Sequence, residues 1–133
     1  NVFGEELIIE NAEEALKRIC KKTQTEIKDY TVAPIFMSGR EKGAHEWIIE
    51  FRKAPKDLDY FTEFLDNALK SLNSDYEAKR YNNITLRMPK VHVARENLFY
   101  DWLKSKDKLG GQHKIPRLSN KREYNEELLQ LNN

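Results

Sequence analysis

Residues 27–52, IKDYTVAPIFMSGREKGAHEWIIEFR, decide the fold, because they have the pattern of a β-hairpin. Residues 27–38 are rich in β-branched and aromatic side chains, which indicates a strand that Pro34 interrupts or places at a sheet edge. Residues 38–43 are polar and contain glycine, as is typical of a hairpin loop. The second strand alternates: Trp47, Ile49 and Phe51 share one side, and Glu46, Ile48, Glu50 and Arg52 share the other.

Helical and extended patterns flank the hairpin. Residues 7–9 predict a short edge strand, and the capping pattern from Asn11 to Glu14 predicts an amphipathic helix over residues 12–23. The next elements are a long helix that Pro55 and Asp57 open and that runs to Leu72, and a short helix that is capped within residues 73–75 and ends at Arg80. A strand over residues 84–93, bent at Pro89, follows. The last elements are a helix around residues 98–103, a loop over residues 106–118, and a helix that begins with Asn120 and Glu123.

This order of elements predicts an α+β fold, in which helices pack against a small mixed or antiparallel sheet of about three to four strands. The length of 133 residues fits one domain, residues 1–133. The chain does not begin with Met, so we expect a processed product or a domain excised from a longer protein.

Charge and composition exclude several classes of protein. Lys and Arg total 23 and Asp and Glu total 22, and this balance excludes a polyanion binder whose whole surface is basic. The single cysteine, Cys20, excludes an internal disulfide and any multi-cysteine metal site. No apolar run reaches the roughly 18 residues of a membrane span, and the N-terminus lacks a signal-peptide pattern.

The isolated reactive residue types favour structural roles. His45, His92 and His113 lack the spacing of metal ligands, so we expect satisfied or surface histidines and no metal site. Cys20 lies on the apolar stripe of the first helix, which favours a core position over a nucleophile.

The loop over residues 106–118 is the main candidate for chemistry. Residues 95–122 contain eight basic and three acidic residues, so the positive charge of the chain is concentrated there. Lys114 and Arg117 can meet a phosphate or carboxylate, and Gly110 and Gly111 permit a close approach of the backbone. A plain solvated loop is the competing interpretation.

Two further interpretations of the loop involve a macromolecule. Gly110-Gly111-Gln112 is the tripeptide that translation release factors present to peptidyl-tRNA, but here it lacks their Gly/Ser-rich lead-in and following Val-Asn. The wider alternative is a small RNA- or protein-binding module that uses this basic loop.

Four separated segments, in order and spanning nearly the whole chain, resemble a known family: residues 3–7, 45–51, 72–80 and 110–118. They read FGEEL, HEWIIEF, LNSDYEAKR and GGQHKIPRL. The resemblance is to the C-terminal domain of the Gretchen Hagen family of acyl acid amido synthetases, known from auxin-responsive plant enzymes and bacterial homologues. This chain resembles a bacterial homologue.

The resemblance implies an adenylate-forming enzyme of the cytoplasm. Such a ligase joins a small-molecule carboxylic acid to ATP, with Mg, and passes the acyl group to the amine of an amino acid. The C-terminal domain is a mobile lid on an N-terminal adenylation domain of the same chain. We therefore expect the isolated domain to be inactive and to bind no cofactor, nucleic acid or membrane.

The resemblance also implies which residues form the site. Lys114 is the expected catalytic residue, because its loop corresponds in place to the C-terminal lysine loop of the superfamily. Gly110, Gly111, Gln112 and Arg117 are the expected substrate- and nucleotide-facing residues. The hinge-side loop is expected at Gly4 and Glu5, for which a simple linker turn is the alternative.

Overall fold

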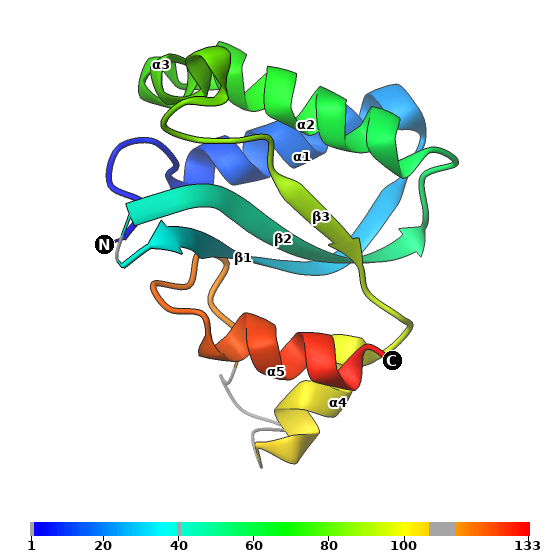
Figure 1. Cartoon of the computed structure of the whole chain (residues 1–133). Coiled ribbons are helices and arrows are strands. Elements are labelled where there is room, and N and C mark those ends of the chain that lie inside the picture. The colour runs from blue at the N-terminus through cyan, green and yellow to red at the C-terminus, as the bar shows by residue number, and fades with distance from the viewer. Residues whose placement is uncertain (1, 40, 107–113) are drawn as a thin grey trace.

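A computed structural model describes residues 2–39, 41–106 and 114–133, and it confirms the α+β fold class (Figure 1). A short 3₁₀ turn, η1 (Tyr81–Asn83), directly follows Arg80. The helices and strands are α1 (Ile9–Thr23), β1 (Glu26–Ser38), β2 (Glu41–Lys53), α2 (Leu58–Leu72), α3 (Ser74–Arg80), β3 (Lys90–Val93), α4 (Leu98–Ser105) and α5 (Glu123–Leu131).

The described strands form a mixed sheet in the order β1-β2-β3. β1 and β2 are the predicted antiparallel hairpin, with Val32 opposite Trp47 and Tyr30 opposite Ile49. β3 is parallel to β2, which places Val91 beside Trp47. The sequence left open whether the sheet was mixed or antiparallel, and the crossover through α2 and α3 makes it mixed.

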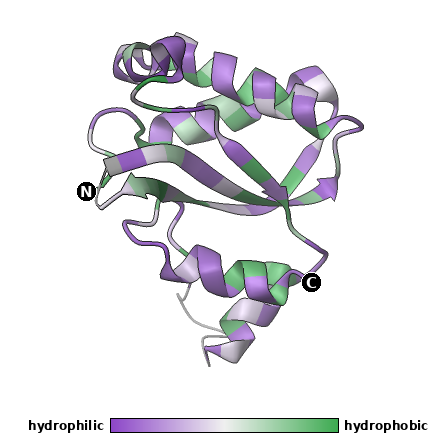
Figure 2. Cartoon of the chain, in the orientation of Figure 1, coloured by the Kyte–Doolittle hydropathy of each residue, from purple (hydrophilic) through white to green (hydrophobic). Residues whose placement is uncertain are grey.

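Helices cover both faces of the sheet, and this explains the alternation in β2. Helices α1 and α2 lie on one face, and α4 and α5 lie on the other (Figure 1). Trp47 and Ile49 belong to the core under α1 and α2, whereas Ile48 belongs to a second core with α4 and α5. Hydrophobic and hydrophilic positions alternate along the elements that face these cores (Figure 2).

Two buried carboxylates of β2 are part of the second face. Glu46 accepts hydrogen bonds from Arg122 at 2.9 Å and Asn125 at 3.1 Å, so its charge is compensated. Glu50 accepts a hydrogen bond from the backbone N–H of Asn97 at 2.8 Å, beside the N-terminus of α4. A carboxylate there also suits the dipole of the helix. The polar side of β2 therefore docks α4 and α5.

The first helix begins earlier than predicted, and the predicted strand over residues 7–9 is wrong. Leu7 is a fully buried loop residue, and Ile9 is already the first residue of α1. Asn11 lies inside the helix, where its side chain accepts the N–H of Ile8 at 3.1 Å. The Asn11 side chain satisfies an unpaired backbone N–H from within the first turn of the helix rather than from the cap position. The capping pattern therefore predicts that a helix is present but does not predict its first residue.

The predicted strand over residues 84–93 is also shorter in the structure. Only Lys90–Val93 pairs with β2, and Ile84 is 74% exposed. The backbone N–H groups of Leu86 and Arg87 donate to Lys79 and Gly43, at 2.9 and 2.8 Å, outside any ladder. Pro89 has no N–H to give, so regular pairing starts after it.

The segment over residues 73–80 ties α2, α3 and the N-terminal loop together. The Asn73 side chain accepts the N–H of Tyr76 at 3.0 Å, as the predicted cap of α3, and donates to the carbonyl of Glu5 at 2.8 Å. Asp66 of α2 accepts hydrogen bonds from Tyr76 at 2.6 Å and from two nitrogens of Arg80, both at 2.7 Å. This segment therefore connects α2, α3 and the N-terminal loop through its side chains.

Candidate functional site

The loop segment, residues 114–119, is held against the open edge of β1. β1 is an edge strand of the sheet, so its outward N–H and C=O groups need other partners. The N–H of Val32 donates to the carbonyl of Arg117 at 2.8 Å, and the N–H of Ser119 donates to the carbonyl of Val32 at 2.8 Å. The loop segment thereby adds a short parallel bridge to the sheet.

The side chain of Arg117 lies on β1. Its guanidinium donates to the carboxylate of Asp29 and, at 2.7 Å, to the carbonyl of Tyr30. The guanidinium carbon is also 4.5 Å from the centroid of the Tyr30 ring, a cation–π distance. The Tyr30 hydroxyl in turn donates to Glu13 at 2.6 Å, and burial, with the neighbouring Glu13 carboxylate, raises the pKa of Tyr30. Arg117 is thus anchored to β1 by three contacts, with the Asp29 carboxylate, the Tyr30 carbonyl and the Tyr30 ring.

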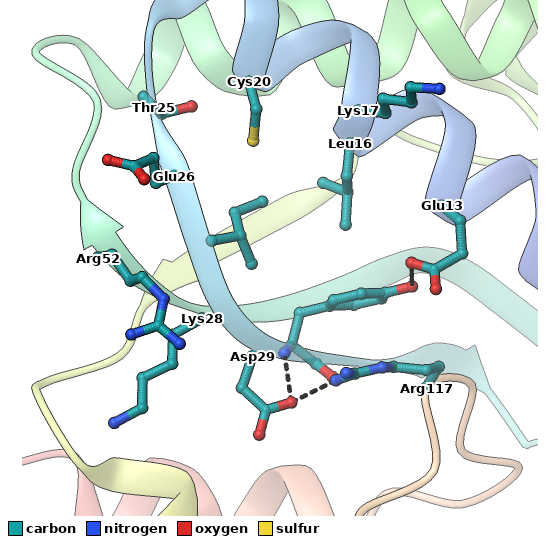
Figure 3. Close-up of a pocket in the computed structure, with 12 residues that line it drawn as sticks. Glu13, Leu16, Lys17, Cys20, Thr25, Glu26, Lys28, Asp29, Arg52 and Arg117 are labelled. Carbon is teal, nitrogen blue, oxygen red and sulfur yellow. Dashed lines mark hydrogen bonds and ion pairs between the residues drawn. The ribbon is translucent and has the colours of Figure 1, made fainter.

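A cleft of about 490 Å³ lies between α1 and this edge of β1 (Figure 3). Figure 3 shows Asp29 and Arg117 directed toward one another across its rim. The lining is of mixed charge, with apolar and sulfur-containing side chains between the ions. The charged lining residues are Lys17, Lys28, Arg52 and Arg117 on the basic side and Glu13, Glu26 and Asp29 on the acidic side.

A second hollow of about 520 Å³ continues this cleft toward α4. Lys28, Asp29 and Arg117 line both, so we treat the two as one feature, the β1-edge cleft. Lys114 lines the second hollow and is exposed. Next to it, Ile115 is only 6% exposed and packs in the core with α4 and α5. Lys114 therefore extends from a backbone that the burial of Ile115 helps to hold in place.

The two predicted hinge-side residues lie in a turn that the domain holds firmly. Gly4 has a φ of +57°, a left-handed conformation that favours glycine, and both Gly4 and Glu5 are exposed. Phe3 and Leu7, on either side of the turn, are fully buried. The turn is consequently attached to the core of the domain on both sides.

Glu6, next to this turn, is the centre of a buried charge cluster. Its carboxylate meets Nε2 of His45 and the ammonium groups of Lys79 and Lys42, at 3.0 and 3.1 Å. Burial alone would raise the pKa of Glu6, but the hydrogen bonds and charges of these partners lower it to about 2. Burial lowers the pKa of His45, whose Nδ1 has no hydrogen-bond partner among the described residues.

The other reactive residue types have structural partners. Nε2 of His92 lies 3.1 Å from Glu46. Cys20 is half-buried and lines the part of the β1-edge cleft next to α1. Burial raises the pKa of its thiol, which disfavours the nucleophilic thiolate. Within residues 2–39, 41–106 and 114–133, no group of three His, Cys, Asp or Glu side chains is arranged to hold a metal ion. His113 lies outside the described residues.

The structure brings some of the predicted site residues together. Lys114 and Arg117 share the second hollow of the β1-edge cleft, whereas Gly4 and Glu5 do not line it. Gly110, Gly111 and Gln112 lie outside the described residues. Asp29 was not predicted from the sequence, because 88 positions separate it from Arg117 and no local pattern connects a strand residue with such a distant loop.

Comparisons with known proteins relate the chain to one family. The sequence profile described as "GH3 family C-terminal domain" matches residues 10–123. A comparison with curated protein sequences found no match. Within the part of the chain that the structure describes, no helix is both long and apolar enough to cross a lipid bilayer.

Two solved structures share the fold. One is a GH3.15 acyl acid amido synthetase, with a TM-score of 0.64 and 15% sequence identity over 93% of this chain. The other is AtGH3.15 acyl acid amido synthetase in complex with 2,4-DB, with a TM-score of 0.67 and 16% identity over 92% of this chain. This chain spans only 22% and 23% of their respective lengths, so the likeness concerns one part of a larger protein.

Proposed function

The chain belongs to the GH3 family C-terminal domain, and from this premise we propose that it is the mobile lid of an ATP-dependent acyl acid amido synthetase. The observation that carries the proposal is the family match over residues 10–123. The matched range includes the segment over residues 73–80 and the whole loop segment, residues 114–119, with Lys114 and Arg117. The matched solved structures are more than four times as long as the region they share with this chain, which leaves room for the domain that the lid would cover.

The proposed reaction has two steps. A carboxylate oxygen of the acyl acid attacks the α-phosphorus of ATP, forming the acyl adenylate and releasing pyrophosphate. The amine of an amino acid then attacks the acyl carbon, forming the amide, releasing AMP and losing a proton. A lid that changes orientation between these steps can present different surfaces to the same site.

Lys114 is the residue that we assign to adenylation. Negative charge accumulates between the carboxylate and the α-phosphate in the transition state, and a fixed cation there lowers the barrier. Lys114 is exposed, and the burial of Ile115 is one of the contacts that hold its backbone in place. The fold therefore sets where the side chain starts, and its flexible four-carbon stem can carry the ammonium group to a phosphate bound by the domain that the lid covers.

The remaining parts of the proposal concern the protein that carries this domain. Its N-terminal adenylation domain, in the same chain, would bind ATP with Mg and select the acyl acid and the amino acid. The described residues of this chain offer no cluster that fits Mg, so we route no step through a metal held here. A bacterial cytoplasm, which supplies ATP and keeps a lone cysteine reduced, is the location we propose.

In the protein that carries this domain, the substitution Lys114→Ala should reduce ATP–pyrophosphate exchange about 100-fold, the effect of removing one transition-state donor. Lys90→Ala is the matched control, because it removes an exposed lysine of β3 outside the β1-edge cleft. Exchange should be normal in the control. Normal exchange in Lys114→Ala would refute the assignment.

The 133-residue chain alone should bind ATP only weakly. The β1-edge cleft carries acidic as well as basic side chains, so it lacks the concentrated positive charge that tight binding of a triphosphate needs. Isothermal titration calorimetry with ATP, and a titration with single-stranded RNA at two salt concentrations, measure this directly. Micromolar affinity for ATP would contradict the lid, and salt-sensitive RNA binding would support the binding-module alternative.

A further inference from the structure

The contacts of the loop segment concentrate on two neighbouring parts of β1. Its backbone is bonded to Val32, and the hydroxyl of Thr31 donates to the carbonyl of Pro116 at 2.6 Å. Upstream, Asp29 and the carbonyl of Tyr30 hold the guanidinium of Arg117. The segment that carries Lys114 is therefore attached to β1 through both its backbone and one long side chain.

The position of Arg117 fits an anchor better than a free phosphate ligand. One of its nitrogens, Nη1, is shared between Asp29 and Tyr30, and the guanidinium also lies over the Tyr30 ring. Only 33% of its side chain is exposed. A phosphate that bound Arg117 from solvent would have to compete with a carboxylate that is already in contact with it.

Arg117 and Lys114 are three positions apart, with the buried Ile115 and the rigid ring of Pro116 between them. Few backbone torsions in this short stretch are free to change. A displacement of Arg117 from β1 is consequently passed on to Lys114, and both residues line the same hollow with Asp29.

We propose that Asp29 is a positioning residue, which sets the location of Lys114 by holding Arg117 against β1. The proposal rests on the proposed function, because it gives Lys114 the role in adenylation. It adds a residue of β1 that the sequence alone did not indicate, and it gives Arg117 the role of attaching the loop segment to β1. A displacement of about 1 Å in a catalytic group is enough to slow a reaction severely.

The first test is Asp29→Asn in the protein that carries this domain. Asn keeps the shape and removes the charge, so we expect ATP–pyrophosphate exchange to fall about 10-fold at saturating ATP, with the KM for ATP unchanged. Asp101→Asn is the matched control, because Asp101 forms a similarly exposed ion pair with Arg95 at 2.9 Å. An Asp29→Asn enzyme with normal exchange would overturn the proposal.

The double variant Asp29→Asn/Lys114→Ala separates positioning from an independent role. If Asp29 acts through Lys114, its substitution should cost nothing further once the lysine is gone. A full additional 10-fold loss in the double variant would mean that Asp29 acts independently of Lys114, and would overturn the proposal.

A charge swap distinguishes the anchor from a phosphate ligand at Arg117. Arg117→Asp alone places two carboxylates together, and adding Asp29→Arg restores the ion pair in reverse. We expect the swap to recover most of the exchange rate that Arg117→Asp loses. A swap that stays as slow as Arg117→Asp would show that the cation itself is needed at position 117, against the anchor.

Amide hydrogen exchange on the 133-residue chain tests the anchor without activity. Asp29→Asn should speed the exchange of the Ser119 amide about 10-fold, because its bond to Val32 lies beside the lost contact, and should leave the amides of α2 unchanged. Unchanged protection of Ser119 would count against the anchor. If the unsubstituted protein shows no pyrophosphate exchange, the proposed function fails, and if Lys114→Ala retains normal exchange, the role of Lys114 fails. In either case the Ser119 result still decides whether Asp29 holds the segment.

Discussion

Replacing Asp66 with alanine is expected to lower the free energy of unfolding by about 3 to 5 kcal/mol, because it leaves a buried charge without its partner. Asp66 is 2% exposed and accepts two hydrogen bonds from Arg80, which is itself 6% exposed. The Tyr76 hydroxyl also loses its acceptor. Burial alone would raise the pKa of Asp66, but Arg80 and Tyr76 lower it, in keeping with a carboxylate that the fold requires in its charged form.

Urea denaturation of the 133-residue chain measures this effect. Asp75→Ala is the matched control, because Asp75 forms an exposed ion pair with Lys79 in the neighbouring helix, α3, and such pairs contribute at most about 1 kcal/mol. Tyr76→Phe should fall between the two, since it removes one hydrogen bond and leaves the ion pair of Asp66 with Arg80 intact. Similar midpoints for Asp66→Ala and Asp75→Ala would contradict the role of the buried network.

The same network gives a structural role to the segment over residues 72–80, one of the four in which the sequence resembles the family. Asn73 joins α3 to the N-terminal loop, and Tyr76 and Arg80 join it to α2. None of these residues lines the β1-edge cleft. In this segment the resemblance therefore involves residues that hold the fold, while the proposed site residues lie in another part of the chain.

Local patterns were enough to predict most elements of the fold. Alternation in β2 predicted the hairpin, and Asp57 and Asn73 predicted the starts of α2 and α3, because these signals depend on neighbours in the sequence. The strand predicted over residues 84–93 was too long, since a run of apolar residues does not show which backbone groups find a ladder partner. The order β1-β2-β3 also required the tertiary structure.

The candidate site was less predictable than the fold. Lys114 and Arg117 were predicted from their charge and from their place in a loop that resembles the family, and the structure brings both to one hollow. Their support is distant in sequence: Asp29 and Tyr30 lie in β1, and Glu6 meets His45 across 39 positions. Such pairings follow from the packing of the whole chain, and one sequence contains no periodic signal for them.

Two buried carboxylates should make the domain sensitive to acid. Glu6 is 1% exposed and Glu46 is 5% exposed, and their partners lower the pKa of each from 4.5 to about 2, against the opposing effect of burial. For Glu46 these partners are His92, Asn125 and Arg122. A carboxyl with a pKa this far below its value in the unfolded chain contributes roughly 3 kcal/mol of stability at neutral pH.

The sign of the pH dependence follows from the protons that each state binds. Between pH 4.5 and about 2 the unfolded chain binds protons at these two positions and the folded chain does not, so stability falls as the pH falls. The contribution is complete above pH 4.5 and is lost as the pH passes through about 2. Together the two groups account for roughly 6 kcal/mol, which is comparable with the whole stability of a small domain.

Urea titrations at a series of pH values from neutral to 2, followed by circular dichroism, should show this loss as a falling denaturation midpoint. Raising the ionic strength should leave most of the loss in place, because salt screens buried pairs much less than exposed ones. Glu46→Gln should be less stable at neutral pH and should lose less stability on acidification, since one of the two protonations no longer occurs. If the stability of the parent chain stays constant across this range, or if Glu46→Gln and the parent lose equal amounts, then these carboxylates are not held in their charged form by the contacts described above.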